Sequence, residues 1–566
     1  MTEVVADVRP LLAVLVSAIA VVLIIASYRH PNVREGWSVL AAFAKFGIVA
    51  SMLPGVLDGH IYVWSFGPFV SDIEFALRAD PLGLYFALLA SFLWIFTAFY
   101  ATGYMRGLDE HAQTRFFAAF AASLSTAVGI AFAQNLLTIF IFYELLSLVT
   151  YPLVAHDESD EARVAGRKYL TYTFFGGGVF LLGGTVLTYY LTGRIAGNAT
   201  TEFVAGGMPE LAEVAAADPL FAQIAFALLA AGFGVKAAVM PLHSWLADAM
   251  VAPTPVSGLL HAVAVVKSGA FGVARVILDV FGPETVAAIG MHVVLAGFAA
   301  FTLVAASIIA LRKDNLKRRL AFSTTAQLSY IVMGLALLHP IALIGALLHI
   351  PAHAFGKLTL FFCAGAIHVE THTDYISEMA GIGKRMPLTM GCFAVGAAGM
   401  AGIPLVAGFV SKFYLLVGST GAGGIGVLGT DAAVMSPWLG LVFASALIVS
   451  GILNIAYFWP IVYTAFFEAE EAYDAKPLLL ADIGGSPHSM GEPVRADGGH
   501  VDHDGTDQHG GAPPGGWERR TPVTESTWLM LVPISLLAVG ALVLGTIPDA
   551  AVFLELARFI VEAVMA

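Results

Sequence analysis

The sequence predicts an all-α polytopic membrane protein with about fourteen transmembrane helices, including two inverted five-helix repeats. Three observations predict this class. Hydrophobic residues make up 58% of the 566-residue chain, and the mean hydropathy is +0.81. Charged residues make up only 12%, about half of the roughly 25% usual for soluble domains. Apolar windows of about 20 residues, the length that crosses a bilayer, recur along the chain.

Fourteen such windows follow one another. They lie at 10–28, 36–54, 81–103, 115–133, 135–155, 168–191, 220–241, 254–280, 288–311, 320–338, 341–366, 387–417, 437–466 and 527–547. The first could be mistaken for a signal peptide, but no polar mature domain follows it, so we expect a retained helix.

Basic residues gather in loops that the helix count places on one side. These loops are Arg29–Arg34, Arg163–Lys168, Arg312–Arg319 and Lys384–Arg385. The positive-inside rule predicts that they face the cytoplasm and that both termini lie outside the cell membrane.

Lysines inside the apolar windows are the strongest functional signal. Lys236 and Lys267 lie in the seventh and eighth windows, and Pro241 interrupts the seventh. A lysine at the centre of a membrane helix costs roughly 2.5–3.5 kcal/mol on insertion scales. The twelfth window repeats the pattern with Pro404 and Lys412. Broken helices with an ionisable residue build ion sites in transporters, so we expect proton or small-cation transport.

The two broken helices lie five windows apart, which predicts a tandem repeat of five helices. Because five is odd, the second copy is expected to be inverted. The predicted units are helices 1–3 at 1–114, repeats at 115–280 and 288–466, a cytoplasmic loop at 467–526, and helix 14 with a tail at 527–566.

The loop at 467–526 is acidic and rich in Gly and Pro, and we expect it to be largely disordered. Its histidines also allow a metal-buffering tract: His488, His500, His503 and His509.

Glu144 lies within the fifth window with about nine residues on each side. Its natural partner is Lys236, since a buried charge left alone would lose its charge. Moving Glu144 away from this lysine would favour release of the lysine proton. The alternative is a residue at a misjudged helix end. Lys267 could instead extend its side chain to the membrane interface. His261, in the same window as Lys267, could be a structural histidine without a role in transport.

His349, His353 and Lys357 follow one another at intervals of four and share one helix face. The HxxxH spacing invites a zinc interpretation, but the glutamate of HExxH is absent and a lysine lies on the same stripe. We favour a proton relay, because histidine titrates near physiological pH. Hydrogen-bonded core histidines are the alternative.

Other classes of function are disfavoured. Cys363 and Cys392 are far apart and form no CxxC or haem-attachment spacing, so no redox cofactor or metal centre is predicted. The net charge of −13 argues against nucleic-acid partners.

At this point the chain resembles the antiporter-like subunits of Mrp-type cation/proton antiporters, membrane-bound hydrogenases and respiratory complex I, and most closely the D subunit of Mrp-type antiporters. The resemblance extends from about Asp80 to Lys412. It rests on ADPLGLYF with GYM (Asp80, Pro81, Gly103), Glu144, PLHSWLADA and PTPVSGLLHA after Lys236, Lys267, Ser323 with LSYI (Leu328–Ile331), the His349–His353–Lys357 trio, and GIP with GFVSKF around Lys412.

The resemblance implies a chain of protonatable groups along the middle of the membrane. Glu144, Lys236 and Lys267 would form the first half-channel, and Lys412 would serve the second. The trio His349, His353 and Lys357 would connect the two. Lys412 departs from the complex I member that carries glutamate there, and Tyr143 stands where many relatives have tryptophan.

Three functions follow as hypotheses. The first is a proton-translocating subunit of a multisubunit Na+/H+ antiporter, and the second is a pump subunit of a redox-driven complex. The third, a scaffold with a dead channel, is disfavoured because the matched positions keep their charges. Either of the first two would need other membrane subunits as partners, since nothing in the chain supplies a driving reaction or catalytic chemistry of its own.

Overall fold

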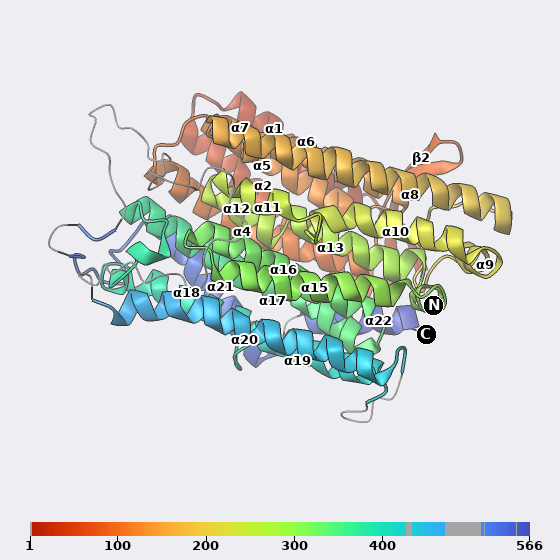
Figure 1. Ribbon diagram of the computed structural model, residues 1–566. Helices are drawn as coiled ribbons and strands as arrows, with labels where there is room; N and C mark the ends of the chain where they lie inside the picture. Colours follow the sequence, from red (N-terminus) through yellow and green to blue (C-terminus); the bar gives the residue numbers. More distant parts are fainter. Residues whose placement is uncertain (1–2, 426–432, 470–510, 514–515, 551, 566) are drawn as a thin grey trace.

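The computed structural model describes residues 3–425, 433–469, 511–513, 516–550 and 552–565, and the side chains of residues 260, 261 and 550 lie outside the description. These residues form an elongated bundle of helices (Figure 1). Within them, eleven helices are long and apolar enough to cross a membrane. They are α1 (Arg9–Ala26), α2 (Pro31–Ala50) continued by α3 (Leu53–Leu57), α4 (Pro81–Gly107), α5 (Gln113–Ala131), α6 (Leu136–Val154), α7 (Asp160–Leu170) continued by α8 (Gly178–Leu191), α10 (Pro219–Lys236), α15 (Met291–Leu311), α17 (Pro340–Thr371), α20 (Pro437–Phe467) and α21 (Trp528–Thr546).

The other three predicted spans are helical as well, but they are either more polar or broken. They correspond to α16 (Leu316–Ala336), to the pair α12 (Thr254–Ala262) and α13 (Val265–Arg275), and to the pair α18 (Pro387–Ala401) and α19 (Ala407–Ala422). The predicted all-α polytopic class is therefore confirmed, together with the breaks in the seventh and twelfth spans. The unbroken eighth span predicted at 254–280 is wrong, because the helix is interrupted between α12 and α13.

Several short elements were not predicted. A three-stranded sheet has β2 (His60–Val70) in its centre, parallel to β1 (Glu3–Ala6) and antiparallel to β3 (Ile73–Ala79). Short helices are α9 (Pro209–Ala217), α11 (Ser244–Asp248), α14 (Pro283–Ala288) and α22 (Val552–Met565), with π-helical turns at Thr171–Gly177, Thr192–Ala196 and Val276–Val280 and 3-10 turns at Ala249–Val251, Ile376–Glu378, Ile382–Lys384 and Pro548–Ala550. Most of the predicted loop at 467–526 lies outside the described residues.

The quoted ADP motif begins α4 and anchors a buried ion cluster. The Asp80 carboxylate accepts from the backbone N–H of Gly83 at 2.7 Å, and Pro81 occupies the first turn, where its missing N–H costs nothing. Arg275 donates to both oxygens of Asp80, at 2.7 and 2.8 Å, and to Asp279 at 2.7 Å. Because this guanidinium is 1% exposed, the cluster ties α4 to the end of α13.

The same local structure occurs twice. Asn135 caps α6 and Asn315 caps α16, each through its side-chain oxygen. The residue after each asparagine donates its N–H to a distant strand-like segment: Leu136 to Thr201 at 3.0 Å and Leu316 to Asp374 at 2.9 Å. The fifth helix and the tenth therefore begin alike, as a five-helix repeat requires.

The basic loops gather at one end of the bundle. Arg318 pairs with Glu161 at 3.2 Å, and Arg34 donates to Gln113 at 2.6 Å, which brings three of the loops to the end where α5 begins. The Asn315 cap lies at this end, whereas the Asn135 cap follows the far end of α5, so the two copies point in opposite directions. Both termini lie at the far end (Figure 1). Which compartment each end faces, and the domain boundaries given above, stay predictions.

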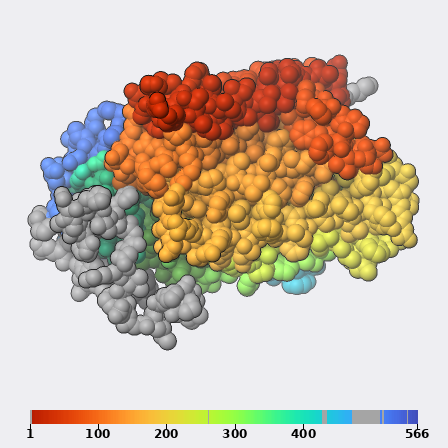
Figure 2. Space-filling model, turned by 90° about the horizontal axis from the view of Figure 1, so that it is seen from above, coloured from red at the N-terminus to blue at the C-terminus, as the bar shows by residue number. Residues whose placement is uncertain are grey.

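The helix α17 is the central element. In its apolar window 89% of the residues are buried, compared with 33% for α1. The helices α1 and α2 lie along one edge of the face in Figure 2, where α1 packs against α5 and α2 packs against α4. Large apolar side chains point outward from peripheral helices, including Val22, Val186, Phe301 and Ile452. Such a surface is suited to lipid.

Candidate proton-transfer site

The first broken helix ends at Lys236, five residues before the predicted interruption at Pro241. The chain then turns into α11, and Lys236 is fully buried. Its ammonium donates to the carbonyl of Tyr143 in α6 at 2.5 Å and lies 3.4 Å from the centre of the Tyr143 ring. A carbonyl oxygen and a ring face are partners that stabilise a cation where water is excluded.

Glu144 is the next residue of α6 and is half-buried. Its Oε1 atom has no hydrogen-bond partner among the described residues. The carboxylate packs against Gly178 of α8, where a Cβ atom would come within 2.4 Å of that oxygen. The ion pair predicted between Glu144 and Lys236 is not formed directly, since the lysine bonds to the neighbouring carbonyl.

Lys267 lies just after the unpredicted break between α12 and α13 and is fully buried. Its ammonium is hydrogen-bonded to Nδ1 of His353 in α17. The structure thus joins a residue of the predicted first half directly to the predicted connection. Gly269 lets α13 lie against the break of α10, because a Cβ atom there would be 2.3 Å from the backbone nitrogen of Ala237.

His349 and His353 lie one turn apart on α17 with Pro351 between them. Their rings are stacked with centres 6.2 Å apart. Pro351 has no N–H to offer the carbonyl of Leu347 one turn earlier. The hydroxyl of Tyr85 in α4 donates to that carbonyl at 2.8 Å instead. This hydrogen bond satisfies the Leu347 carbonyl, which Pro351 leaves without a helical partner.

His349 continues the connection toward the second broken helix. Its Nδ1 lies 2.8 Å from the hydroxyl of Ser411, and its Nε2 lies 3.0 Å from the side-chain oxygen of Gln327. An amide oxygen only accepts, so Nε2 donates and Nδ1 of the neutral ring can accept. Ser411 directly precedes Lys412 in α19.

Lys412 is placed much as Lys236 is. The helix α18 ends at Ala401, the φ of +82° at the following Gly402 suits glycine, and α19 begins at Ala407. The Lys412 ammonium donates to the carbonyl of Met400 at 2.5 Å and lies 4.7 Å from the centre of the Tyr330 ring. We call Lys267, His353, His349, Ser411 and Lys412 the histidine line.

Lys357 shares the helix and the face of the two histidines but bonds elsewhere. Its ammonium donates to the carbonyl of Leu320 in α16 at 3.0 Å and lies 5.3 Å from the centre of the Phe458 ring. No hydrogen bond described for Lys357 joins it to the histidine line. His261, for which a structural role was the alternative, has a side chain outside the description.

Sequence reasoning missed a branch of polar side chains next to His349. Gln327 donates to Asn454 of α20 at 3.4 Å, and Tyr457 bonds both to Asn454 and to Ser323, the latter at 2.9 Å. All four are fully buried. Asn454 could have been found, since an amide in the middle of a 31-residue apolar helix needs a partner.

One buried lysine lies apart from this set. Lys45 of α2 donates to the carbonyl of Leu124 in α5 at 2.7 Å and lies 5.5 Å from the centre of the Trp94 ring. No described hydrogen bond links it to the histidine line, so the environment of a buried lysine does not by itself mark a member of the site.

The site as a whole is a row of buried groups that can accept and release protons. The row runs from the break after α10 to the break before α19. Hydrogen bonds join Lys267 to His353 and His349 to Ser411, and the stacked rings of His353 and His349 lie between these two bonds. Titratable side chains held at hydrogen-bonding distance inside a membrane protein are typical of proton relays.

Comparison with protein families identifies relatives of the chain. The family model described as NADH:quinone oxidoreductase/Mrp antiporter, TM, matches residues 133–464, more than half of the chain. NADH-quinone oxidoreductase subunit N of Desulforudis audaxviator is 32% identical over 476 residues, which cover 83% of this chain and 81% of that protein. An Na(+)/H(+) antiporter subunit of Alkalihalophilus pseudofirmus is 31% identical over 405 residues, which cover 67% of this chain but only 48% of that protein.

Solved structures show the same fold. A chain of the membrane-bound sulfane sulfur reductase, an archaeal respiratory membrane complex, superposes with a TM-score of 0.74 at 21% identity, over 99% of this chain and 98% of that one. A chain of the Mrp complex from Dietzia sp. DQ12-45-1b gives a TM-score of 0.71 at 22% identity, over 97% of this chain and 52% of that one.

Proposed function

Because the chain belongs to the NADH:quinone oxidoreductase/Mrp antiporter family of membrane subunits, we propose that it translocates protons in a multisubunit Na+/H+ antiporter, in the role of an Mrp-type D subunit. Other membrane subunits of the complex are its partners, in the cell membrane, with the basic loops in the cytoplasm. Protons would pass along Glu144, Lys236 and the histidine line, with Lys357 beside it.

One observation carries the proposal. The ammonium of Lys267 is bonded to His353, and His349 is bonded to Ser411 beside Lys412. A scaffold without transport has no need to keep several cationic side chains in the membrane interior, where each is costly. The hydrogen bond between Lys267 and His353 also provides the geometry for proton transfer.

A redox-driven complex is the second candidate, and a specific observation favours it. The relatives that match over most of both lengths are named as parts of respiratory complexes: the subunit N of Desulforudis audaxviator and the sulfane sulfur reductase chain. The proton-transfer role of this chain would be the same in that setting. The energy source would be an electron-transfer reaction in other subunits.

A pH-gradient dye assay separates the two candidates. Inverted vesicles are prepared from a host without its own Na+/H+ antiporters that expresses the whole complex, either intact or with Glu144→Gln or Lys236→Ala. For an antiporter, added Na+ collapses the gradient in the intact complex and fails to do so in both variants.

A different result identifies the second candidate. If Na+ has no effect but an electron donor builds a gradient that either variant abolishes, the chain belongs to a redox-driven pump. If the variants transport protons as the intact complex does under both conditions, the proposed role of Glu144 and Lys236 is wrong.

A further inference from the structure

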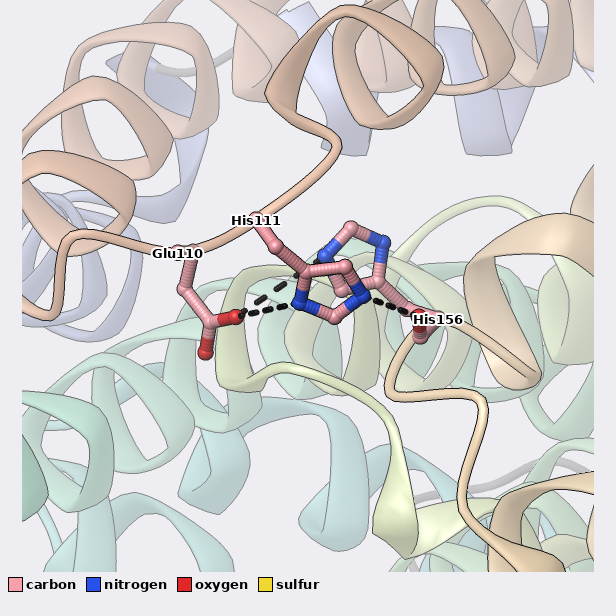
Figure 3. Close-up of side chains that lie close together, drawn as sticks. All are labelled: Glu110, His111 and His156. Atoms are coloured by element: carbon pink, nitrogen blue, oxygen red, sulfur yellow. Dashed lines mark hydrogen bonds and ion pairs between the residues drawn. The ribbon is translucent and has the colours of Figure 1, made fainter. Parts of the chain in front are cut away.

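Three side chains with metal-binding atoms meet outside the apolar spans, at the end of the bundle that carries the basic loops. Glu110 and His111 come from the turn between α4 and α5, and His156 comes from the loop between α6 and α7 (Figure 3). One carboxylate oxygen and two ring nitrogens lie within 4.8 Å of one another. The fold therefore brings together two loops that are distant in the sequence.

The hydrogen bond of His111 fixes which of its nitrogens is available. Its Nε2 lies 3.0 Å from the carbonyl oxygen of His156. A carbonyl only accepts, so Nε2 carries the hydrogen and Nδ1 of the neutral ring carries a lone pair. That lone pair faces Oε2 of Glu110 at 3.7 Å. A cation between these two electron-rich atoms would stabilise the arrangement, and metal-bound histidines typically donate their second N–H to a carbonyl in this way.

His156 supplies an independent observation. Its side chain is fully buried, yet neither ring nitrogen has a hydrogen bond of normal geometry within the described residues. Its Nε2 lies 3.9 Å from the same Glu110 oxygen. Burial, with a smaller contribution from His111 and Arg115, lowers the pKa of His156 to about 4. A buried polar ring without a partner costs free energy unless a ligand satisfies it.

We propose that Glu110, His111 and His156 bind one Zn²⁺ ion, through Oε2, Nδ1 and Nε2 respectively. Two imidazole nitrogens and a carboxylate oxygen form a ligand set that zinc favours, and water can complete a tetrahedron. With metal–ligand bonds of about 2.0–2.1 Å, tetrahedral ligand atoms lie about 3.3 Å apart. The observed carboxylate-to-ring separations of 3.7 and 3.9 Å need only a small contraction, and the two ring nitrogens, which lie within 4.8 Å of one another, must also move closer together.

The ion would fasten the end of α6 to the turn between α4 and α5. His156 follows Val154, the last residue of α6, by two positions, and α6 carries Glu144. The proposal does not depend on proton transport by the chain. It replaces the expectation from sequence that no metal site is present.

Zinc binding to the purified complex tests the proposal. The complex is prepared without a polyhistidine tag, stripped with a chelator, and titrated with Zn²⁺ by calorimetry and with Co²⁺ by visible absorption. Loop histidines are removed first by replacing His488, His500, His503 and His509 with Asn, so that they cannot contribute.

In this background we expect one ion per chain, a four-coordinate Co²⁺ spectrum and a higher melting temperature with Zn²⁺. His111→Ala and Glu110→Gln should each weaken Zn²⁺ binding by at least about tenfold. Loss of a residue that only hydrogen-bonds to a metal ligand already weakens binding by that much. His30→Ala is the matched control, because His30 is exposed at the same end.

Two results would overturn the zinc site. One is the absence of any binding to the stripped complex. The other is binding that His111→Ala and Glu110→Gln leave unchanged. Since His111 has a half-exposed side chain, its replacement should not prevent folding, and unchanged assembly of the variant complex verifies this.

Discussion

The two broken helices hold their lysines in similar ways but differ in what lies beside them. Lys236 and Lys412 each donate to a backbone carbonyl and lie over a tyrosine ring, Tyr143 and Tyr330 respectively. Beside Lys236 there is a carboxylate, Glu144. Counting nine residues from each helix cap, from Asn135 and from Asn315, gives Glu144 in one copy and Thr324 in the other.

The difference suggests how two copies of one repeat can divide a task. In the first copy, movement of a charged carboxylate can change the proton affinity of Lys236. In the second copy there is no carboxylate at the matching position, and the neighbour of Lys412 is Ser411, bonded to His349. The first copy is suited to control by charge, and the second to transfer along neutral hydrogen bonds.

The largest effect is expected where the first copy loses its lysine. Lys236→Ala removes the buried cation and its contacts with Tyr143, so transport by the complex should fall by about 100-fold or more, a loss typical of removing a proton-transferring group. The rate of gradient collapse in inverted vesicles measures it. Normal transport in a variant complex that assembles fully would remove Lys236 from the site.

The asymmetry between the copies is tested by a matched pair of substitutions. Glu144→Gln should slow transport by at least about tenfold, which corresponds to about 1.4 kcal/mol of lost electrostatic interaction. Thr324→Val keeps the volume and removes only a hydroxyl that bonds within its own helix, so its transport rate should stay near that of the intact complex. Equal losses in both variants would show that the carboxylate has no special role.

A smaller effect is expected within the second copy. Ser411→Ala removes the hydrogen bond to His349, and transport should slow by about fivefold, since a neutral hydrogen bond contributes about 1 kcal/mol. Ser419→Ala is the control, because that hydroxyl is buried on the same helix but donates to Gly440 at 3.0 Å. If both variants slow transport equally, the loss reflects packing of α19 and says nothing about the histidine line.

The smallest effect is expected outside both copies. Lys45→Met removes a buried lysine that is bonded to a backbone carbonyl, as Lys236 is, but lies between α2 and α5. The initial transport rate per assembled complex should equal that of the intact complex. A loss as large as that of Lys236→Ala would mean that any buried lysine is needed, whatever its position.

The sequence predicted the parts of the molecule that depend on local composition. Apolar length located the spans, and the glycine and proline near Lys412 predicted the break before α19. The break before Lys267 was missed, because Val263 and Ala264 carry no such signal. Regular spacing along α17 placed His349 and His353 correctly on one face, but it also suggested that Lys357 joins them, whereas tertiary packing directs that lysine to α16.

Contacts between distant segments could not be predicted from one sequence. The bond between Lys267 and His353 joins α13 to α17, and Asn454 reaches Gln327 from α20. The cluster around His156 is another such case, because its members come from two loops. Each residue type was visible in the sequence, but its partner was set by the packing of helices.

The central claim is that both copies belong to one connected proton path, joined where Lys267 meets His353. The most direct test is the transport rate of a complex that carries Lys267→Met, compared with Lys45→Met in the same inverted vesicles. One connected path predicts that Lys267→Met loses as much transport as Lys236→Ala, while Lys45→Met loses none. A Lys267→Met complex that keeps half or more of the intact rate would contradict the claim, since the two copies would then conduct protons independently.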